Sequence, residues 1–134
     1  MSELLSTLPV QFRTVRYDGA RIPDGRHDLS VGANCQLYAY AVLAHFGIDL
    51  PPWRSSELWN DEQLTLGVTE FEPLDLLLFS RTGEAFGAHV AVYAGAGQAL
   101  HLCKSVGQPA LWSLAEFAER PEYGVLLGGK RALR

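Results

Sequence analysis

Two cysteines and four histidines occur in the sequence, and three of these residues have the types and spacing that nucleophilic catalysis requires. Cys35 opens a segment with helical periodicity, and a helix N-terminus stabilises a thiolate through its free N–H groups and its macrodipole. The Cys35 N–H group would also point toward an oxyanion formed on an attacked carbonyl. The base and the group that orients it are then sought among the histidines, and His89 and His101 are the natural candidates. The sequence therefore predicts a Cys35 nucleophile served by this histidine pair.

The two histidines stand twelve positions apart, on opposite sides of the turn Gly95-Ala96-Gly97. A hairpin folded around Ala96 places position 89 near position 103 and makes position 101 a diagonal neighbour of 89. Because 89 and 101 differ by an even number, their side chains are expected on one face of the sheet. One imidazole can then hold the other in the required tautomer and orientation.

A helix over residues 34–46 is expected to position the cysteine. Apolar residues recur there at helical spacing, and alanines occupy several of the remaining positions. Asn34 suits the N-cap, because its side-chain oxygen can accept a hydrogen bond from a free N–H group of the first turn. Gly47 suits the left-handed stop at the other end. This helix begins with Cys35.

The remaining segments predict a single α+β domain spanning residues 1–134. A short helix is expected from Ser55 or Ser56 and another over 113–119, and strands are expected over 74–79, 88–94, 98–103 and 123–133. A helix followed by an antiparallel meander favours an architecture in which the helix covers one face of the sheet.

Composition narrows the function classes. The chain has 134 residues, of which 48% are hydrophobic and 19% charged, and its net charge is -4 with neutral histidines. These values are typical of a globular domain, and the scattered Lys and Arg residues do not indicate nucleic-acid binding. The first residues show neither a secretory signal nor a membrane anchor, so the chain is expected to stay in the cytoplasm where it is made. No cofactor or metal is required by this interpretation.

Several residues have simpler interpretations that stay open. A free cysteine on an apolar helix is often a buried small hydrophobe, and Cys103 is expected to be structural because no helix end stabilises its thiolate. His27 and His45 are expected to have no functional role. Cys35, His89, His101 and Cys103 could instead be four zinc ligands, although the paired spacing of strong zinc motifs is missing. A binding domain without catalysis is a further alternative.

The sequence resembles the NlpC-type cysteine peptidases of bacterial cell walls over roughly residues 17–131. The resemblance rests on four segments: Gly32-Ala33-Asn34-Cys35-Gln36-Leu37-Tyr38, Leu74-Asp75-Leu76-Leu77-Leu78-Phe79, Ala88-His89-Val90-Ala91-Val92-Tyr93-Ala94-Gly95 and Gln98-Ala99-Leu100-His101. It implies a compact papain-like α+β fold in which a helix carrying the cysteine packs on a central antiparallel sheet. It also implies Cys35 as nucleophile, His89 as base and His101 as orienting residue.

The resemblance implies further site residues and exposes one departure. The family commonly has an upstream tyrosine that assists the oxyanion, and Tyr17 is the only tyrosine before Cys35. The family usually has Asp-Cys-Ser-Gly at the nucleophile, whereas this chain has Asn34-Cys35-Gln36-Leu37. Asn34 and Gln36 are therefore expected at the substrate, and the uncharged Asn34 predicts a substrate without a free amino terminus at the cleavage site.

The implied activity is hydrolysis of a peptide or amide bond, in a peptidoglycan-derived or similar small peptide, through a thioester on Cys35. Related papain-like enzymes transfer the acyl group to an acceptor other than water, so an acyltransferase with the same triad is an alternative. A toxin or phage-tail lytic component, exported without a signal peptide, is another. The expected partner is a peptide or amide substrate, with no nucleic acid and no membrane.

Overall fold

A computed structural model describes residues 6–133 and shows one antiparallel sheet of six strands in the order β1-β6-β2-β3-β4-β5. The strands are β1 (Thr65–Val68), β2 (Leu76–Ser80), β3 (His89–Gly95), β4 (Gln98–Leu102), β5 (Pro109–Ser113) and β6 (Val125–Ala132). The helices are α2 (Gln11–Thr14), α3 (Cys35–His45), α4 (Ser55–Asn60) and α5 (Leu114–Ala118), with the 3-10 turn η1 (Pro121–Tyr123). The α+β fold with a cysteine-bearing helix on an antiparallel sheet is confirmed.

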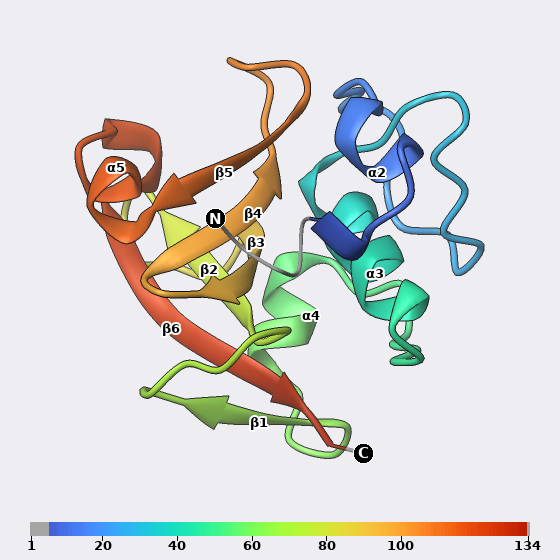
Figure 1. Cartoon of the computed structure of the whole chain (residues 1–134). Coiled ribbons are helices and arrows are strands. Elements are labelled where there is room, and N and C mark those ends of the chain that lie inside the picture. Colours follow the sequence, from blue (N-terminus) through green and yellow to red (C-terminus); the bar gives the residue numbers. More distant parts are fainter. Residues whose placement is uncertain (1–5, 134) are drawn as a thin grey trace.

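The two faces of the sheet are covered by different elements (Figure 1), with α3 on one side and α5 on the other. Side chains alternate between the faces along each strand. Toward α3 the sheet presents a cluster that includes Leu78, Val90 and Leu100, and toward α5 it presents Phe79, Ala91 and other residues packed on Phe117. His89 and His101 belong to the α5 face by the same alternation.

Helix α3 is buried along most of its length, since every residue from Gln36 to Leu43 is buried. A helix that is apolar on all sides is expected in the centre of a fold rather than on its surface. The Asn34 side chain accepts a hydrogen bond from the Leu37 N–H group, and Gly47 has a φ of 85° just past the last turn. The predicted start and stop of this helix are therefore both confirmed.

The β3–β4 hairpin has the predicted turn. Gly95, Ala96 and Gly97 all have positive φ, and the strands pair with Val92 opposite Leu100. In this register position 89 falls opposite position 103. The predicted diagonal relation of positions 89 and 101 is thus confirmed.

The predicted simple meander is wrong at the two edges of the sheet. β6 returns to lie between β1 and β2, and the edge strands β1 and β5 were not predicted. β6 can take this central place because Gly129 leaves room for a neighbouring ring: a Cβ there would lie 2.9 Å from Phe71 Cε1. Long-range pairing of this kind leaves little local signal in a sequence.

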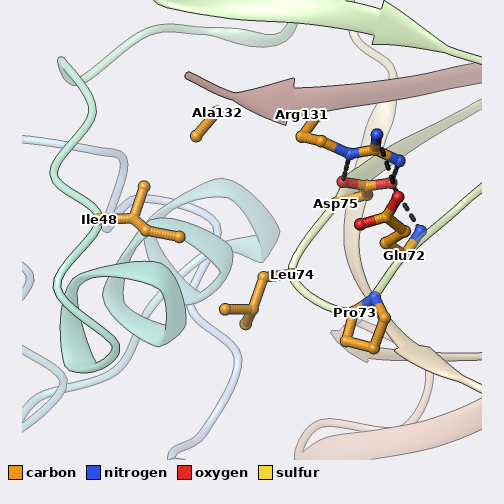
Figure 2. Close-up of a pocket in the computed structure, with 7 residues that line it drawn as sticks. All are labelled: Ile48, Glu72, Pro73, Leu74, Asp75, Arg131 and Ala132. Atoms are coloured by element: carbon orange, nitrogen blue, oxygen red, sulfur yellow. Dashed lines mark hydrogen bonds and ion pairs between the residues drawn. The ribbon is translucent and has the colours of Figure 1, made fainter. Parts of the chain in front are cut away.

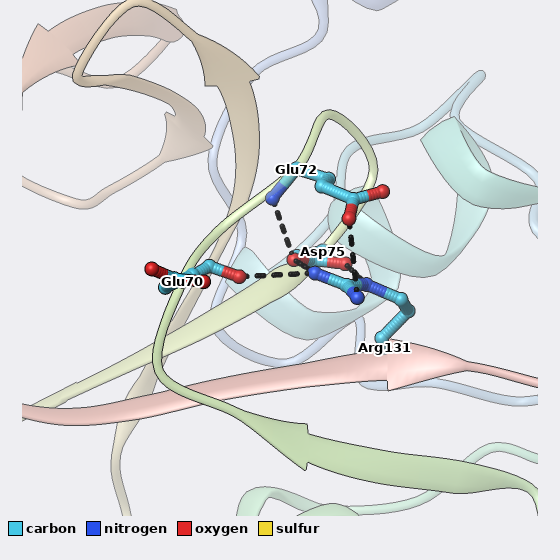
Figure 3. Close-up of polar contacts among 4 residues, drawn as sticks. All are labelled: Glu70, Glu72, Asp75 and Arg131. Atoms are coloured by element: carbon cyan, nitrogen blue, oxygen red, sulfur yellow. Dashed lines mark hydrogen bonds and ion pairs between the residues drawn. The ribbon is translucent and has the colours of Figure 1, made fainter.

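A buried ion pair joins β6 to the segment before β2 (Figure 3). Asp75 is buried, and its carboxylate accepts bonds from Arg131 Nε at 2.8 Å and Arg131 Nη2 at 2.9 Å. The Glu72 N–H group donates to the same carboxylate at 2.7 Å, and the Glu72 carboxylate lies 3.3 Å from Arg131 Nη1. The bidentate geometry fixes β6 against the start of β2.

Candidate active site

Cys35 is the first residue of α3 and is partly exposed. Burial is the largest influence on its thiol and raises the pKa, whereas hydrogen bonding from the N–H groups of Val90, Gln36 and Cys35 itself lowers it, as does the charge of Arg54. The N–H groups therefore act in the expected direction, but the net pKa shift is upward. Stabilisation of the thiolate by the helix N-terminus therefore stays a prediction, with burial opposing it.

His89 and His101 form a hydrogen-bonded pair beneath the α5 face of the sheet. His89 Nε2 lies 2.9 Å from His101 Nδ1, and the two rings are nearly perpendicular at 87°. Burial lowers the pKa of both imidazoles well below the ordinary value, so both rings are neutral at pH 7. One ring donates to the other, and the bond leaves His89 Nδ1 as the nitrogen available to another group.

The backbone brings the thiol to the beginning of β3. Val90 directly follows His89, and its N–H group lies near enough to the Cys35 sulfur to lower the pKa of the thiol. Within residues 6–133 no hydrogen bond joins this sulfur to an imidazole. The pairing of Cys35 with His89 as nucleophile and base therefore stays a prediction that the placement of the two residues supports.

A serine of α4 fixes the residue that precedes His89. The Ser55 hydroxyl donates to the Ala85 carbonyl at 2.7 Å and accepts from the Ala88 N–H group at 3.1 Å. The loop into β3 is thus tied to α4. Sequence reasoning expected a helix near Ser55 but found no signal for this contact, because the partners are about thirty positions apart.

Aromatic side chains cover the histidine pair. The Tyr123 ring stacks on His89 with centroids 4.5 Å apart and planes at 30°, while Trp112 and Phe117 contact His101 at 4.1 and 4.6 Å. These three residues come from η1, β5 and α5, and the sequence analysis missed all of them. The sequence predicts a helix over 113–119, and Ser113 caps the observed α5, but the orientation of α5 over the histidines depends on tertiary structure.

Tyr17 lies beside the cysteine segment, as its expected role requires. It forms an isolated parallel bridge with Ala33, and its N–H group donates to the Gly107 carbonyl at 2.8 Å. Burial raises the pKa of its hydroxyl, and so do the nearby thiols of Cys35 and Cys103. A surface groove borders this tyrosine and is lined by Arg16, Tyr17, Asp18, Gly19, Val31, Lys104 and Gly107.

Asn34 and Gln36 are placed differently from the expectation. Both side chains are buried: Asn34 caps α3, and Gln36 Oε1 accepts from Arg54 Nε at 3.1 Å. Their side-chain oxygens bind groups of the chain itself, so their predicted role at the substrate has no support from these contacts. The inference from the uncharged Asn34 to a substrate without a free amino terminus loses its basis as well.

The other sulfur and imidazole groups occupy the places expected of structural residues. Cys103 is buried, with its sulfur 3.4 Å from the Ser105 hydroxyl. His45 packs between Phe12 and Phe46, and His27 pairs with Asp49 at 3.2 Å.

The zinc alternative needs the side chains of Cys35, His89, His101 and Cys103 to converge on one point. In the described part of the chain no group of three or more His, Cys, Asp or Glu residues is arranged to hold a metal ion. The two imidazoles instead turn a nitrogen toward each other.

A second pocket lies at the opposite end of the sheet (Figure 2). Ile48, Leu74 and Ala132 line its apolar side, and the charged residues of its other side, including Asp75 and Arg131, bind each other. Its polar groups are therefore already paired.

No helix in residues 6–133 has the length and apolar character needed to cross a membrane.

Comparison with solved structures identifies the fold. An NlpC/P60 family protein from Bacillus cereus matches with a TM-score of 0.67 and 20% identity, over 92% of this chain and 37% of that one. The NlpC/P60 domain of the peptidoglycan hydrolase SagA matches with 0.60 and 21%, over 92% of each chain. The peptidoglycan hydrolase RipB from Mycobacterium tuberculosis matches with 0.57 and 18%, over 89% of this chain and 58% of that one.

These likenesses show that the chain has the papain-like fold of NlpC/P60 domains. The chain spans about two fifths of the Bacillus cereus protein and nearly all of the SagA domain. No protein-family model matches the sequence, and no curated protein sequence matches it.

Proposed function

We propose that this chain is a cysteine hydrolase of the NlpC/P60 type that cleaves a peptide or amide bond through a thioester on Cys35. The observation that carries the proposal is the 2.9 Å bond between His89 and His101, formed at the strand position whose neighbouring N–H group reaches the Cys35 sulfur. A nucleophile, a base and an orienting residue are thereby supplied from α3, β3 and β4.

Because the Cys35 thiol and the His89 ring are both uncharged before reaction, the first chemical step includes a proton transfer between them. His89 Nδ1 accepts the thiol proton as the Cys35 sulfur attacks the substrate carbonyl, so the carbon–sulfur bond and the imidazolium form together. His101 Nδ1 accepts a hydrogen bond from the protonated Nε2 of His89, which leaves His89 Nδ1 free to receive the proton. The Cys35 N–H group and the Tyr17 hydroxyl are the proposed donors to the oxyanion.

The tetrahedral intermediate then collapses to a thioester, and the thioester is hydrolysed. The carbon–nitrogen bond breaks, and the departing amine takes the proton from His89. Water next attacks the thioester with His89 as base, which releases the acid and restores the thiol. Transfer of the acyl group to an amine instead of water uses the same residues, and product analysis distinguishes the two reactions.

The proposed substrate is a peptide derived from peptidoglycan or a similar small peptide. This choice is supported by the likeness to SagA and RipB, which are named peptidoglycan hydrolases. The groove beside Tyr17 is the proposed path of the peptide, because Tyr17 lines it and bridges Ala33, two residues before Cys35.

The test is a digestion of purified peptidoglycan peptides, read by mass spectrometry. The wild-type protein is expected to release fragments with a new carboxyl terminus, and Cys35→Ala and His89→Ala are expected to release none above background. Cys103→Ser serves as the matched thiol control and should keep turnover. Turnover by Cys35→Ala at the wild-type rate would exclude the proposed nucleophile.

A further inference from the structure

This inference rests on the proposed function and concerns a residue that orients the proposed base, His89. We propose that Tyr123 is a positioning residue, whose ring lies against the face of the His89 imidazole. The substrate and the reacting atoms are not contacted by Tyr123 in this proposal. Its role is to fix the plane of the His89 ring.

The need for such a residue follows from the geometry of the histidine pair. A single hydrogen bond at Nε2 restrains one point of the His89 ring, but the ring can still turn about its Cβ–Cγ bond within the range that this hydrogen bond tolerates. Turning moves Nδ1, the nitrogen that must face the thiol. A face-to-face contact restricts this rotation, and Tyr123 makes it at 4.5 Å with planes at 30°. Phe117 lies farther from His89, at 6.3 Å, and instead contacts His101.

Tyr123 is itself held by its backbone and by neighbouring rings. Its N–H group donates to the Arg120 carbonyl at 3.0 Å within the turn η1. Its ring also packs against Trp112 and Phe117, with centroids 6.1 and 6.0 Å apart, and burial and the nearby Cys103 thiol raise the pKa of its hydroxyl. The Tyr123 ring is thus held by its own turn and by aromatic side chains of β5 and α5.

The tyrosine also excludes water from the base. His89 is buried on the sheet face that η1 covers, and burial is the cause of its lowered pKa. The other titratable groups are His101 on β4, Arg120, whose charge acts on His101, and the thiols of Cys35 and Cys103, which act on the Tyr123 hydroxyl. Since desolvation dominates, removing the covering ring should raise the pKa of His89 toward its ordinary value.

The experiment compares Tyr123→Leu, Tyr123→Phe and the control Tyr93→Leu. Tyr93 lies on the same face of the sheet but packs on Phe71 and bonds to Gly97, remote from the histidines. Tyr123→Leu is expected to lower kcat about tenfold or more with KM changed less than about twofold, since small errors in the placement of a catalytic group cost rate. Tyr123→Phe keeps the stacked ring and should restore kcat to within about threefold of wild type. Tyr93→Leu should leave both constants near wild type.

An NMR titration of the His89 ring makes the inference independent of activity. In Tyr123→Leu the His89 pKa should rise and its ring shifts should move, whereas Tyr93→Leu should leave them unchanged; circular dichroism confirms that each variant is folded. A His89 pKa in folded Tyr123→Leu equal to that of wild type overturns the inference, even if the protein hydrolyses nothing. An equal loss of kcat in Tyr123→Phe and Tyr123→Leu overturns it as well. Failure of wild-type hydrolysis with the expected NMR change overturns the proposed function alone.

Discussion

At the scale of single residues, burial determines the charge state in which the proposed catalytic groups meet. It raises the pKa of the Cys35 thiol and lowers the pKa of His89 and His101, so each shift favours the uncharged form. A preformed thiolate–imidazolium pair is thereby disfavoured in the free chain. Proton transfer to His89 is instead expected to accompany attack on the substrate, as in general-base catalysis.

The acid limb of the activity profile should reflect this lowered pKa. His89 must be unprotonated to accept the thiol proton, and it becomes protonated only when the pH falls through its depressed pKa. We therefore expect kcat/KM to fall with a midpoint well below 6.5, the ordinary histidine value. Circular dichroism at each pH separates this loss from acid unfolding, which the buried neutral histidines also promote at low pH. A midpoint at 6.5 or above in the folded protein would contradict a buried, uncharged His89–His101 pair.

The two thiols should differ in their reaction with iodoacetamide. Cys35 is partly exposed, whereas Cys103 is 1% exposed and can react only when the structure opens. We expect Cys35 to be labelled at least about tenfold faster, with a rate that is still rising above pH 8.5 because its pKa is raised. Peptide mapping by mass spectrometry after timed labelling measures both rates. Equal rates, or a Cys35 rate that levels off near pH 6, would show that the thiol environment differs from the one described.

At the scale of elements, the start of α3 has two consequences, one for stability and one for the site. The Asn34 cap satisfies the Leu37 N–H group at 2.8 Å and sets the residue at which the helix begins. The cap therefore also determines where Cys35 and its N–H group lie. Helix geometry and the proposed oxyanion donor therefore depend on one side chain.

Replacing this cap gives a quantitative test. Asn34→Ala should lower the free energy of unfolding by about 1 kcal/mol, within a range of about 0.5–2 kcal/mol, because one N–H group loses its partner. Asn34→Asp keeps an acceptor and should lose much less. Urea unfolding followed by circular dichroism measures both values. If the two substitutions destabilised the chain equally, the hydrogen bond would not be the source of the effect.

Elements with strong local signals could be predicted from the sequence. The apolar spacing, Asn34 and Gly47 predicted α3, and the turn around Ala96 predicted the β3–β4 hairpin and its register. The strands β1 and β5 and the insertion of β6 were missed, because they depend on pairing between distant segments. Single strands with few alternating residues give a weak signal on their own.

In the candidate site, too, the features with a local sequence signal could be predicted and those that depend on distant segments could not. The proximity of His89 and His101 followed from an even spacing across a turn, so it could be predicted. Tyr123, Ser55 and Arg54 could not, since each reaches the site from another element and none lies in a local motif. The net direction of the Cys35 pKa was also missed, because burial cannot be read from the helix start alone.

At the scale of the whole molecule, the candidate site and the ion pair lie at opposite ends of the sheet. His89 pairs with Phe79 at one end of the β2–β3 ladder. At the other end the Tyr93 N–H group donates to the Asp75 carbonyl, beside the contact with Arg131 (Figure 3). The α3 and α5 layers connect the two ends. Stability and chemistry should therefore be separable by mutation.

Asp75→Asn tests this separation. The carboxylate accepts from Arg131 Nε, Arg131 Nη2 and the Glu72 N–H group, whereas an amide offers one acceptor oxygen and presents its NH₂ group to a donor. We expect the melting temperature to fall by on the order of 5 °C or more, because a buried charge-assisted contact is lost. Glu72→Gln is the matched control, since its carboxylate is 69% exposed and contributes little.

The activity of the Asp75→Asn variant decides whether the two ends are independent. At a temperature where the variant is fully folded, its kcat/KM should equal that of the wild type, because no contact of the histidine pair or of Cys35 involves this ion pair. Differential scanning fluorimetry and peptide turnover on the same samples measure both quantities. A folded variant with reduced kcat/KM would show that the ion pair positions the catalytic groups through the strands β2 and β3. An unchanged melting temperature would instead show that the buried carboxylate contributes no net stability.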